Sequence, residues 1–365
     1  MAAQETPTAY VGGTGDMAAS RMRYQSEMSI GVDRFLEPRN TECPWCNSAA
    51  LKVLLRSPDV VQHKPGRFTL EECGGCGHVF QNPRLTPEGL EFYYRDCYDG
   101  YQEALRERMF KLQAATYRGR IAFLDRHASP KAWLDVGAGH GHFCRAARAH
   151  WPNAVFDGLD FGDGVDKGVR RGWIDRSHRG PFPELADDLT GRYDVVSMHH
   201  YLEHTLDPFA ELDAAARVLP PGGHLLIEVP DPEWPLSRVL GRRWNPWCQP
   251  QHLHMFPIGN LKEALRNRGL DPVAEERGMA HQTGADLLMA TVQFWNALMP
   301  DPDAPWLPSR GTGYRMSRKA ALVAKAPSLA LAGFLDVLIL PAARSANRGN
   351  AYRVLARKAP YRAEG

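Results

Sequence analysis

Short apolar stretches alternate with segments of helical spacing through the middle of the chain. Strands are expected at residues 132–134, 155–160, 193–198 and 224–229, and helices at 143–149 and 211–219. A Pro-Pro-Gly-Gly turn at 220–223 ends the second helix. Because strands that alternate with helices form parallel sheets, this order predicts an α/β fold with a doubly wound, mostly parallel sheet.

The turn after the first strand carries the most informative pattern. Residues 135–141 read Asp-Val-Gly-Ala-Gly-His-Gly. Glycines let the backbone turn sharply and approach a ligand closely, and the following helix directs its N-terminus toward the same place. The pattern indicates a nucleotide-binding turn, with an ordinary strand-to-helix turn as the alternative for the glycines alone. Asp160 ends the next strand, where an acid in a doubly wound sheet accepts hydrogen bonds from both ribose hydroxyls.

Larger blocks of the sequence extend this interpretation. The D-x-G-x-G-x-G turn resembles the first motif of class I S-adenosylmethionine-dependent methyltransferases. Residues 193–230 resemble the central block of their small-molecule members, with a Glu-His pair before Asp-Pro and a VLxPGG turn. QHLHMF at 251–256 and the expected closing strand at 350–360 resemble later segments of that family. The resemblance covers about residues 41–280 and 346–360. It implies a seven-stranded Rossmann-like sheet, methyl transfer and S-adenosylmethionine as cofactor.

The resemblance also implies which residues hold the cofactor. Asp135 is expected to fix the glycine turn and the amino acid end of the cofactor, Phe161 to flank the adenine, and His199 to line the cleft. The full expected set is Asp135, Gly137, Ala138, Gly139, Gly141, Asp160, Phe161 and His199.

Three residues are candidates for the acid–base chemistry that methyl transfer to a hydroxyl requires. Glu203 and His204 match the family's Glu-His pair and follow a strand whose carboxyl end faces the cleft. His252 matches the histidine of the family's His-Leu segment. Histidine accepts a proton near neutral pH, and a neighbouring carboxylate raises its basicity. We expect these three to be catalytic; the alternative is that the histidines are packed structural residues and Glu203 orients a loop or caps a helix.

Four cysteines precede the predicted sheet in two C-x-x-C pairs. Cys43 and Cys46 form the first pair, and Cys73 and Cys76 form the second. Four thiolates held in two tight turns complete a tetrahedral shell that suits structural Zn²⁺. Disulfides or redox-active pairs would call for an oxidising compartment or a thioredoxin-like context, and the sequence indicates neither.

The segment after these cysteines resembles the connector in methyltransferases that begin with a zinc ribbon. Its tyrosines Tyr93, Tyr94, Tyr98 and Tyr101 pack over cofactor and substrate in such enzymes. An aromatic helix face that docks the zinc module onto the core is an equally good interpretation.

These features divide the chain into six parts. They are a disordered lead-in at 1–40, a zinc-binding module at 41–85, an aromatic helical connector at 86–125, the cofactor-binding core at 126–280, a helical lid or insertion at 281–345, and a closing strand and tail at 346–365. No signal segment is seen at the N-terminus. The apolar run at about 320–341 is interrupted by Lys325, Pro327 and Asp336, so no transmembrane segment and a cytoplasmic location are expected.

Composition limits the partners. The net charge is only +2 over 365 residues, so no nucleic acid partner is expected. Residues 301–365 hold 11 Lys plus Arg against 4 Asp plus Glu. This excess is either a solvated face or an attraction for an anionic substrate or a membrane surface.

The favoured function is O-methylation of a small molecule, with a sugar, glycan or specialised metabolite favoured by resemblance. An rRNA or tRNA base methyltransferase with a zinc knuckle is an alternative, as is a non-catalytic zinc-ribbon protein that binds a ligand or a partner. The sequence does not indicate the oligomeric state.

Overall fold

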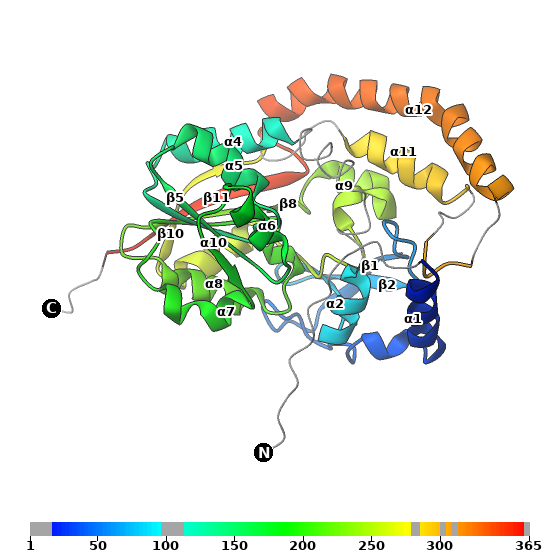
Figure 1. Ribbon diagram of the computed structural model, residues 1–365, viewed down its shortest axis with the longest axis horizontal. Coiled ribbons are helices and arrows are strands. Elements are labelled where there is room, and N and C mark those ends of the chain that lie inside the picture. Colours follow the sequence, from blue (N-terminus) through cyan, green and yellow to red (C-terminus); the bar gives the residue numbers. More distant parts are fainter. Residues whose placement is uncertain (1–16, 96–112, 279–284, 300–303, 309–311, 361–365) are drawn as a thin grey trace, which may run out of the picture.

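The computed structural model describes residues 17–95, 113–278, 285–299, 304–308 and 312–360, and its main sheet has seven strands in the order β10-β11-β8-β7-β4-β5-β6 (Figure 1). The strands are β4 (Ala132–Val136), β5 (Val155–Asp160), β6 (Ser177–Arg179), β7 (Val195–His199), β8 (His224–Pro230), β10 (Leu270–Glu276) and β11 (Ala351–Lys358). β8, β7, β4, β5 and β6 run parallel, whereas β11 is antiparallel to β8 and β10. The expected doubly wound, mostly parallel seven-stranded sheet is confirmed.

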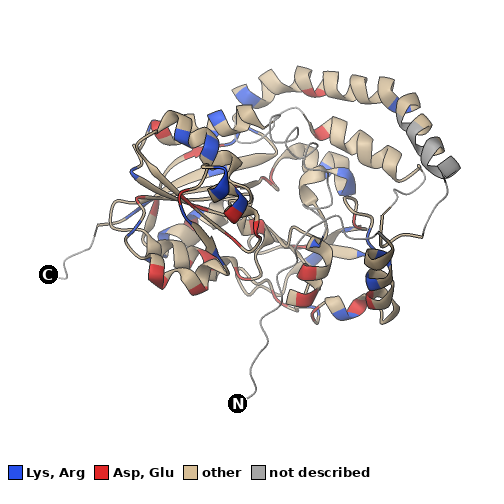
Figure 2. Ribbon diagram, in the orientation of Figure 1, with Lys and Arg blue, Asp and Glu red and all other residues tan. Residues whose placement is uncertain are grey.

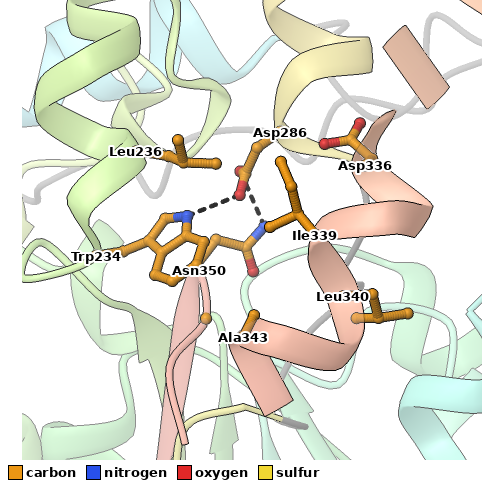
Figure 3. A pocket seen from close by; sticks show the side chains of 9 residues that line it. Trp234, Leu236, Asp286, Asp336, Ile339, Leu340, Ala343 and Asn350 are labelled. Atoms are coloured by element: carbon orange, nitrogen blue, oxygen red, sulfur yellow. Dashed lines mark hydrogen bonds between the residues drawn. The ribbon is translucent and has the colours of Figure 1, made fainter. Parts of the chain in front are cut away.

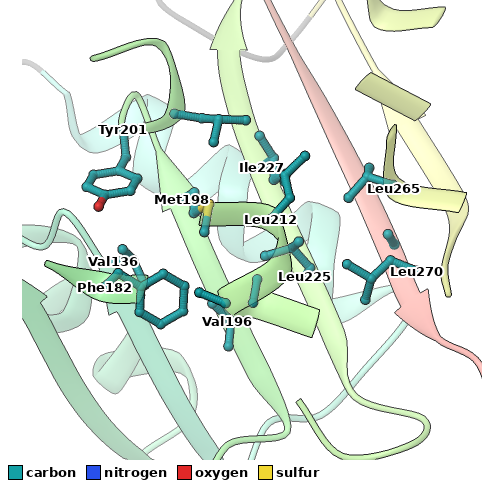
Figure 4. Packing of buried hydrophobic residues seen from close by; sticks show 14 of the residues in the cluster. Val136, Phe182, Val196, Met198, Tyr201, Leu212, Leu225, Ile227, Leu265 and Leu270 are labelled. Carbon is teal, nitrogen blue, oxygen red and sulfur yellow. The ribbon is translucent and has the colours of Figure 1, made fainter. Parts of the chain in front are cut away.

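Helices cover both faces of this sheet (Figure 1). On one face lie α4 (Ala114–Asp125), α5 (His142–His150) and α6 (Gly164–Arg170), whose apolar side chains form one buried cluster with those of the sheet. On the other face lie α7 (Phe182–Leu185), α8 (Pro208–Val218) and α10 (Ile258–Arg266), whose side chains pack with Val136, Val196 and Ile227 of the central strands (Figure 4). Strands covered on both sides are apolar at nearly every position. The short apolar runs in the sequence therefore predict these strands correctly.

A smaller antiparallel sheet, in the order β1-β2-β3-β9, lies beside the main one. β1 (Leu51–Ser57), β2 (Phe68–Cys73) and β3 (Val79–Gln81) come from the cysteine-containing segment, and β9 (His254–Met255) comes from the QHLHMF segment. Val79 pairs with Met255 and Phe80 with His254. The segment at 41–85 is therefore joined to the larger domain by backbone hydrogen bonds as well as by side-chain packing.

The expectation of a disordered lead-in is wrong for residues 17–40. They form α1 (Met17–Ser29) and the short helix η1 (Asp33–Phe35), and Tyr24 and Phe35 are buried. Tyr24 lies edge-on to Phe92 of α2 (Pro87–Tyr94), with 5.6 Å between ring centroids, and to Trp306 at 5.2 Å. A few aromatic side chains thus fix a segment that has no helical apolar pattern of its own. Residues 1–16 lie outside the described residues.

Three short helices connect β8 to β9: α9 (Pro235–Leu240), η4 (Gly241–Arg243) and η5 (Asn245–Trp247). Two further short helices, η2 (Asp187–Leu189) and η3 (Leu202–His204), lie beside β7 in the sequence. In the range where an insertion was expected, α11 (Asp286–Asn296) packs against the long helix α12 (Thr312–Ser345) at the outer edge of the molecule (Figure 1).

Helix α12 runs unbroken past Lys325, Pro327 and Asp336. In the part of the chain that the structure describes, one segment, Val323–Ser345, is long and apolar enough to cross a membrane by length and composition. Lys325, Pro327 and Asp336 therefore do not end the helix, and the apolar run is more continuous than the sequence suggests.

Candidate active site

The glycine turn lies at the carboxyl end of β4 and leads into α5. The φ angle is +77° at Gly137 and +54° at Gly139, a region that side-chain-bearing residues seldom adopt. A Cβ at Gly137 would lie 2.7 Å from the Tyr201 ring, whereas one at Gly139 would meet nothing within 4 Å. Packing thus fixes one side of the turn, and the other faces open space. Gly141, also at positive φ, is the N-cap of α5, and its N–H donates to the carbonyl of Ala138 at 2.9 Å.

Asp160 is held against this turn. Its Oδ2 accepts a hydrogen bond from the Gly139 N–H at 2.9 Å, and its Oδ1 accepts one from the Gly162 N–H at 3.0 Å. Burial raises the pKa of Asp160, although these two backbone N–H groups oppose the shift. Phe161, the next residue, is 63% exposed. An exposed ring beside a half-buried carboxylate leaves room for a flat ligand to lie against both.

Asp135 lies beneath the turn rather than in the open. Its Oδ1 accepts hydrogen bonds from the Ser197 hydroxyl at 2.6 Å and from His199 Nδ1 at 3.2 Å. Burial, with the charge of Arg120 adding to it, lowers the pKa of His199 to about 4. The ring is therefore neutral at physiological pH, and because Nδ1 carries its proton toward Asp135, Nε2 is the acceptor. That Nε2 is buried and has no hydrogen-bond partner among the described residues.

His200 was not among the expected site residues, yet it links the two halves of the site. Its Nδ1 lies 3.0 Å from Glu203 Oε1 and its Nε2 lies 3.2 Å from Glu228 Oε1. Although burial opposes a charge on the ring, these two carboxylates raise the pKa of His200 to about 9. Both ring nitrogens therefore donate, and His200 is an imidazolium. Its φ is +51° and its backbone N–H donates to the Glu228 carbonyl at 2.8 Å, neither of which a single sequence reveals.

Two loops that are distant in sequence meet at the Glu-His pair. The Leu253 N–H donates to the backbone carbonyl of Glu203 at 2.8 Å, and His204 Nδ1 lies 3.0 Å from the carbonyl oxygen of Gln251. The rings of His204 and His252 lie edge to face with 4.4 Å between their centroids. The structure thus brings the three expected catalytic residues together, and Gln251 is a contributor that sequence reasoning missed.

Backbone carbonyls fix the tautomers of both histidines. A carbonyl only accepts, so His252 Nδ1, at 2.7 Å from the Pro246 oxygen, and His204 Nδ1, beside the Gln251 oxygen, must each carry a proton. Burial, with His204 adding to it, lowers the pKa of His252 to about 3, and burial also lowers the pKa of His204. Both rings are neutral at physiological pH, with the lone pair on Nε2. Within the described residues, no hydrogen bond occupies either Nε2 atom.

Glu203 supplies the negative charge of this cluster. Although burial disfavours its carboxylate, the hydrogen bond from His200 and the charge of His200 lower its pKa to about 2. Its Oε2 is buried without a hydrogen-bond partner among the described residues. One oxygen of Glu203 and one nitrogen each of His204 and His252 lie within 4.8 Å of one another. Two imidazoles and a carboxylate can stabilise a proton taken up by either ring, and they are also a ligand set that suits a divalent metal ion.

Tyr94, from the end of α2, reaches into the same cluster. Its hydroxyl contacts His204 Nδ1 and lies 3.3 Å from the Gln251 carbonyl oxygen. Tyr93 points the other way, and its hydroxyl donates to the Pro65 carbonyl at 2.6 Å within the aromatic cluster around Phe35 and Phe92. Tyr93 therefore fits the docking interpretation, whereas Tyr94 lies against the expected catalytic residues. Tyr98 and Tyr101 lie outside the described residues.

The four expected metal ligands also converge. The Sγ atoms of Cys43, Cys46, Cys73 and Cys76 all lie within 4.8 Å of one another. Cys43 and Cys76 are 3.8 Å apart, and Cys46 and Cys73 are 3.5 Å apart. Tetrahedral Zn²⁺ with ordinary Zn–S bonds separates its sulfurs by about 3.8 Å, so the residues present fit a zinc ion. The remaining described cysteines, Cys144 and Cys248, lie elsewhere in the fold.

Comparison with known proteins agrees with this architecture. The profile of a family described as "Methyltransferase domain" matches residues 101–275. Ubiquinone biosynthesis O-methyltransferase of Saccharophagus degradans is 28% identical over 179 residues, which cover 44% of this chain and 73% of that protein. The protein of the same name from Marinobacter nauticus is 28% identical over 181 residues, with the same coverage.

Two solved structures are also similar. An S-adenosylmethionine-dependent methyltransferase from Thermotoga maritima, described as a possible histamine N-methyltransferase, has 14% identity and a TM-score of 0.43, over 74% of this chain and 98% of that one. The 1,6-didemethyltoxoflavin-N1-methyltransferase of Burkholderia thailandensis, solved with S-adenosylhomocysteine, has 16% identity and a TM-score of 0.43, over 80% and 96%.

The sheet order, the glycine turn and the sequence matches define the class. The protein is a class I S-adenosylmethionine-dependent methyltransferase. More than half of the chain lies outside the match to the curated relatives, which covers 44% of it.

Proposed function

We propose that this enzyme transfers a methyl group from S-adenosylmethionine to a hydroxyl of a small molecule, and that His204 removes the proton. The acceptor oxygen attacks the methyl carbon, the carbon–sulfur bond breaks, S-adenosylhomocysteine leaves, and the hydroxyl proton passes to His204 Nε2. The observation that carries this proposal is that both Nδ1 atoms of the His204–His252 pair are committed to carbonyls, which leaves their Nε2 lone pairs for the acceptor.

His204 is a better base than His252 on electrostatic grounds. Burial lowers the pKa of both histidines, and the Glu203 carboxylate and a backbone carbonyl oppose the shift in each. After burial, the largest influence on His204 is Glu203, which favours its protonated form, whereas the largest influence on His252 is the charge of His204, which helps to lower its pKa to about 3. A base whose pKa is nearer the working pH transfers a proton more effectively. His252 then positions the acceptor, and Glu203 stabilises the imidazolium that forms on His204.

The open side of the glycine turn is the proposed cofactor cleft. We expect the Asp160 carboxylate to accept hydrogen bonds from the ribose and Phe161 to flank the adenine. The unpartnered His199 Nε2 lies beneath the same strand ends. Asp135 acts indirectly, because its carboxylate orients His199 and Ser197.

The names of the curated relatives support oxygen as the methylated atom and a small acceptor. They give no support to a sugar, a glycan or an anionic acceptor. The Cys43, Cys46, Cys73 and Cys76 cluster is proposed to hold structural Zn²⁺, because all four thiolates are used and none of the expected catalytic residues is a ligand.

A screen with methyl-labelled S-adenosylmethionine tests the proposal. The acceptor panel contains phenols, catechols, amines, sugars and total RNA. We expect label on hydroxylated small molecules, with S-adenosylhomocysteine formed in equal amount, and loss of that transfer in His204→Asn. Label on RNA or on amines alone would contradict the proposed acceptor class, and full activity of His204→Asn would contradict the proposed base.

A further inference from the structure

The outward face of α12 is apolar without interruption. Between Val323 and Ala342, every residue that is exposed is Val, Ala, Pro, Leu or Phe. The large side chains are well exposed, including Val323 at 74%, Leu331 at 58% and Phe334 at 59%. A helix on the surface of a soluble protein normally turns its polar residues toward water. An apolar face of this length needs another medium or a partner.

The polar residues of the same stretch turn inward. Lys325 Nζ lies 4.0 Å above the ring of Trp295 on α11, and the Trp295 indole N–H donates to the Ser328 hydroxyl at 2.9 Å. Asp336 is only 3% exposed. Its carboxylate accepts hydrogen bonds from the N–H groups of Leu287 and Leu288 at 2.9 and 2.8 Å, at the start of α11. The amphipathicity of α12 is therefore inverted relative to that of a water-facing helix.

The inner face of α12 is firmly attached to the rest of the enzyme. Asp286 at the start of α11 accepts hydrogen bonds from the Trp234 indole N–H at 2.8 Å and from Asn350 Nδ2 at 3.1 Å (Figure 3). Around them, Asp336 and Ile339 of α12 enclose a cavity of about 20 Å³, room for roughly one water molecule. The inner side of α12 is thus already packed against the rest of the protein. The apolar outer face is therefore not the side that packs on the protein core.

Charge around this face favours an anionic surface. Between residues 304 and 363, Asp336 is the only acid in the sequence, and it is buried. Blue residues mark the C-terminal end of the long helix, and its middle carries little charge (Figure 2). Arg344 in the last turn of α12 and Arg348 just after the helix are exposed.

We propose that α12 docks this enzyme on the surface of an anionic lipid bilayer. The helix lies in the plane of the interface, with Leu331, Phe334 and Leu338 among the acyl chains and the exposed Arg344 and Arg348 at the headgroups. If α12 crossed the bilayer, Asp336 and Lys325 would lie in hydrocarbon and would lose their contacts with α11. We therefore infer that α12 binds to one leaflet only. A second copy of the chain fits less well, because two such faces would bring like charges together.

Flotation of the full-length protein with vesicles tests this directly. Vesicles of phosphatidylcholine alone are compared with vesicles that also contain about 30% phosphatidylglycerol. We expect binding to the anionic vesicles, weakened by raised salt, and at least about a ten-fold fall in partition coefficient for Leu331→Glu combined with Leu338→Glu. The matched control is Met22→Glu with Ile30→Glu, which adds the same charge at two exposed apolar positions on and beside α1. It should bind as the wild type does.

A second measurement does not depend on a disruptive substitution. In Phe334→Trp, the fluorescence of the new indole should be quenched by bromine atoms on the acyl chains of anionic vesicles. Absence of quenching, or absence of wild-type binding to anionic vesicles, would overturn the proposal. So would a lipid-free dimer that the Leu331→Glu, Leu338→Glu variant converts to monomer, because that result would assign the face to a second copy.

Discussion

The imidazole of His252 lies edge-on to that of His204, with 4.4 Å between ring centroids, and each ring holds its Nδ1 against a different backbone carbonyl. The hydrogen bonds of Nδ1 thus orient both rings and leave their Nε2 atoms unprotonated. Because the carbonyls belong to Gln251 and Pro246, the loop before β9 determines which nitrogen of each ring is available. Residues that appear in the sequence as separate candidates act as one unit in the structure.

Replacement of His204 should mainly affect turnover. We expect His204→Asn to lower kcat by about 10²-fold or more, the usual contribution of a general base, with the affinity for S-adenosylmethionine unchanged. His252→Asn should raise KM more than it lowers kcat. The measurement is steady-state methyl transfer to the acceptor found by the screen. His224→Asn, at the far end of β8, is the control, and a loss of activity there equal to that of His204→Asn would contradict the assignment.

The pH dependence of catalysis follows from the direction of the His204 shift. Only the neutral ring accepts a proton, and burial lowers the pKa of His204 below its usual value of 6.5. The neutral form therefore persists to lower pH than for an exposed histidine. We expect the acid limb of the kcat/KM profile to fall below pH 6.5. An acid limb above pH 7 that is absent in His204→Asn would show that the base has an elevated pKa instead.

Stability should respond to pH through His200. Its pKa is raised to about 9 in the folded protein, above the unfolded value of about 6.5. The stabilising contribution is therefore fully present below pH 6.5 and is lost as pH rises through 9, and it amounts to roughly 3 kcal/mol. Asn tolerates the positive φ at this position, so His200→Asn is the suitable variant. The difference in unfolding free energy between the wild type and His200→Asn should shrink between pH 6.5 and 9.5. A difference that stays constant over this range would exclude a charged His200.

Loss of one cysteine ligand should lower both metal content and stability. We expect purified wild type to contain about one zinc per chain, and Cys73→Ser to contain much less and to unfold at lower temperature. The effect should spread beyond the small sheet, because β9 of the larger domain completes it. Cys248→Ser lies outside the cluster and should keep its zinc. A wild type without metal that is as stable as the zinc-loaded protein would end the zinc proposal.

Local patterns predicted much of this fold because they reflect local physics. Val155–Asp160 is a strand as expected, since an apolar run between turn signals has few alternatives, and four thiols at C-x-x-C spacing converge. Long-range contacts were harder to foresee. The order in α1 depends on Tyr24 meeting Trp306, and the charge on His200 depends on Glu228, one strand away. The inward turn of Lys325 and Asp336 was hidden because sequence alone does not show which side of a helix meets the protein.

Calorimetric titration with S-adenosylhomocysteine shows directly whether the cleft beside the glycine turn binds the cofactor. We expect saturable binding with one site per chain, and at least about a ten-fold loss of affinity in Asp160→Ala, because the Asp160 carboxylate also holds Gly139 in place. Asp163→Ala, at a half-buried acid three residues further along whose side chain forms an ion pair with Lys167, should bind normally. Wild-type protein that shows no saturable heat with this compound would contradict the claim that the cleft beside the glycine turn binds the methyl donor.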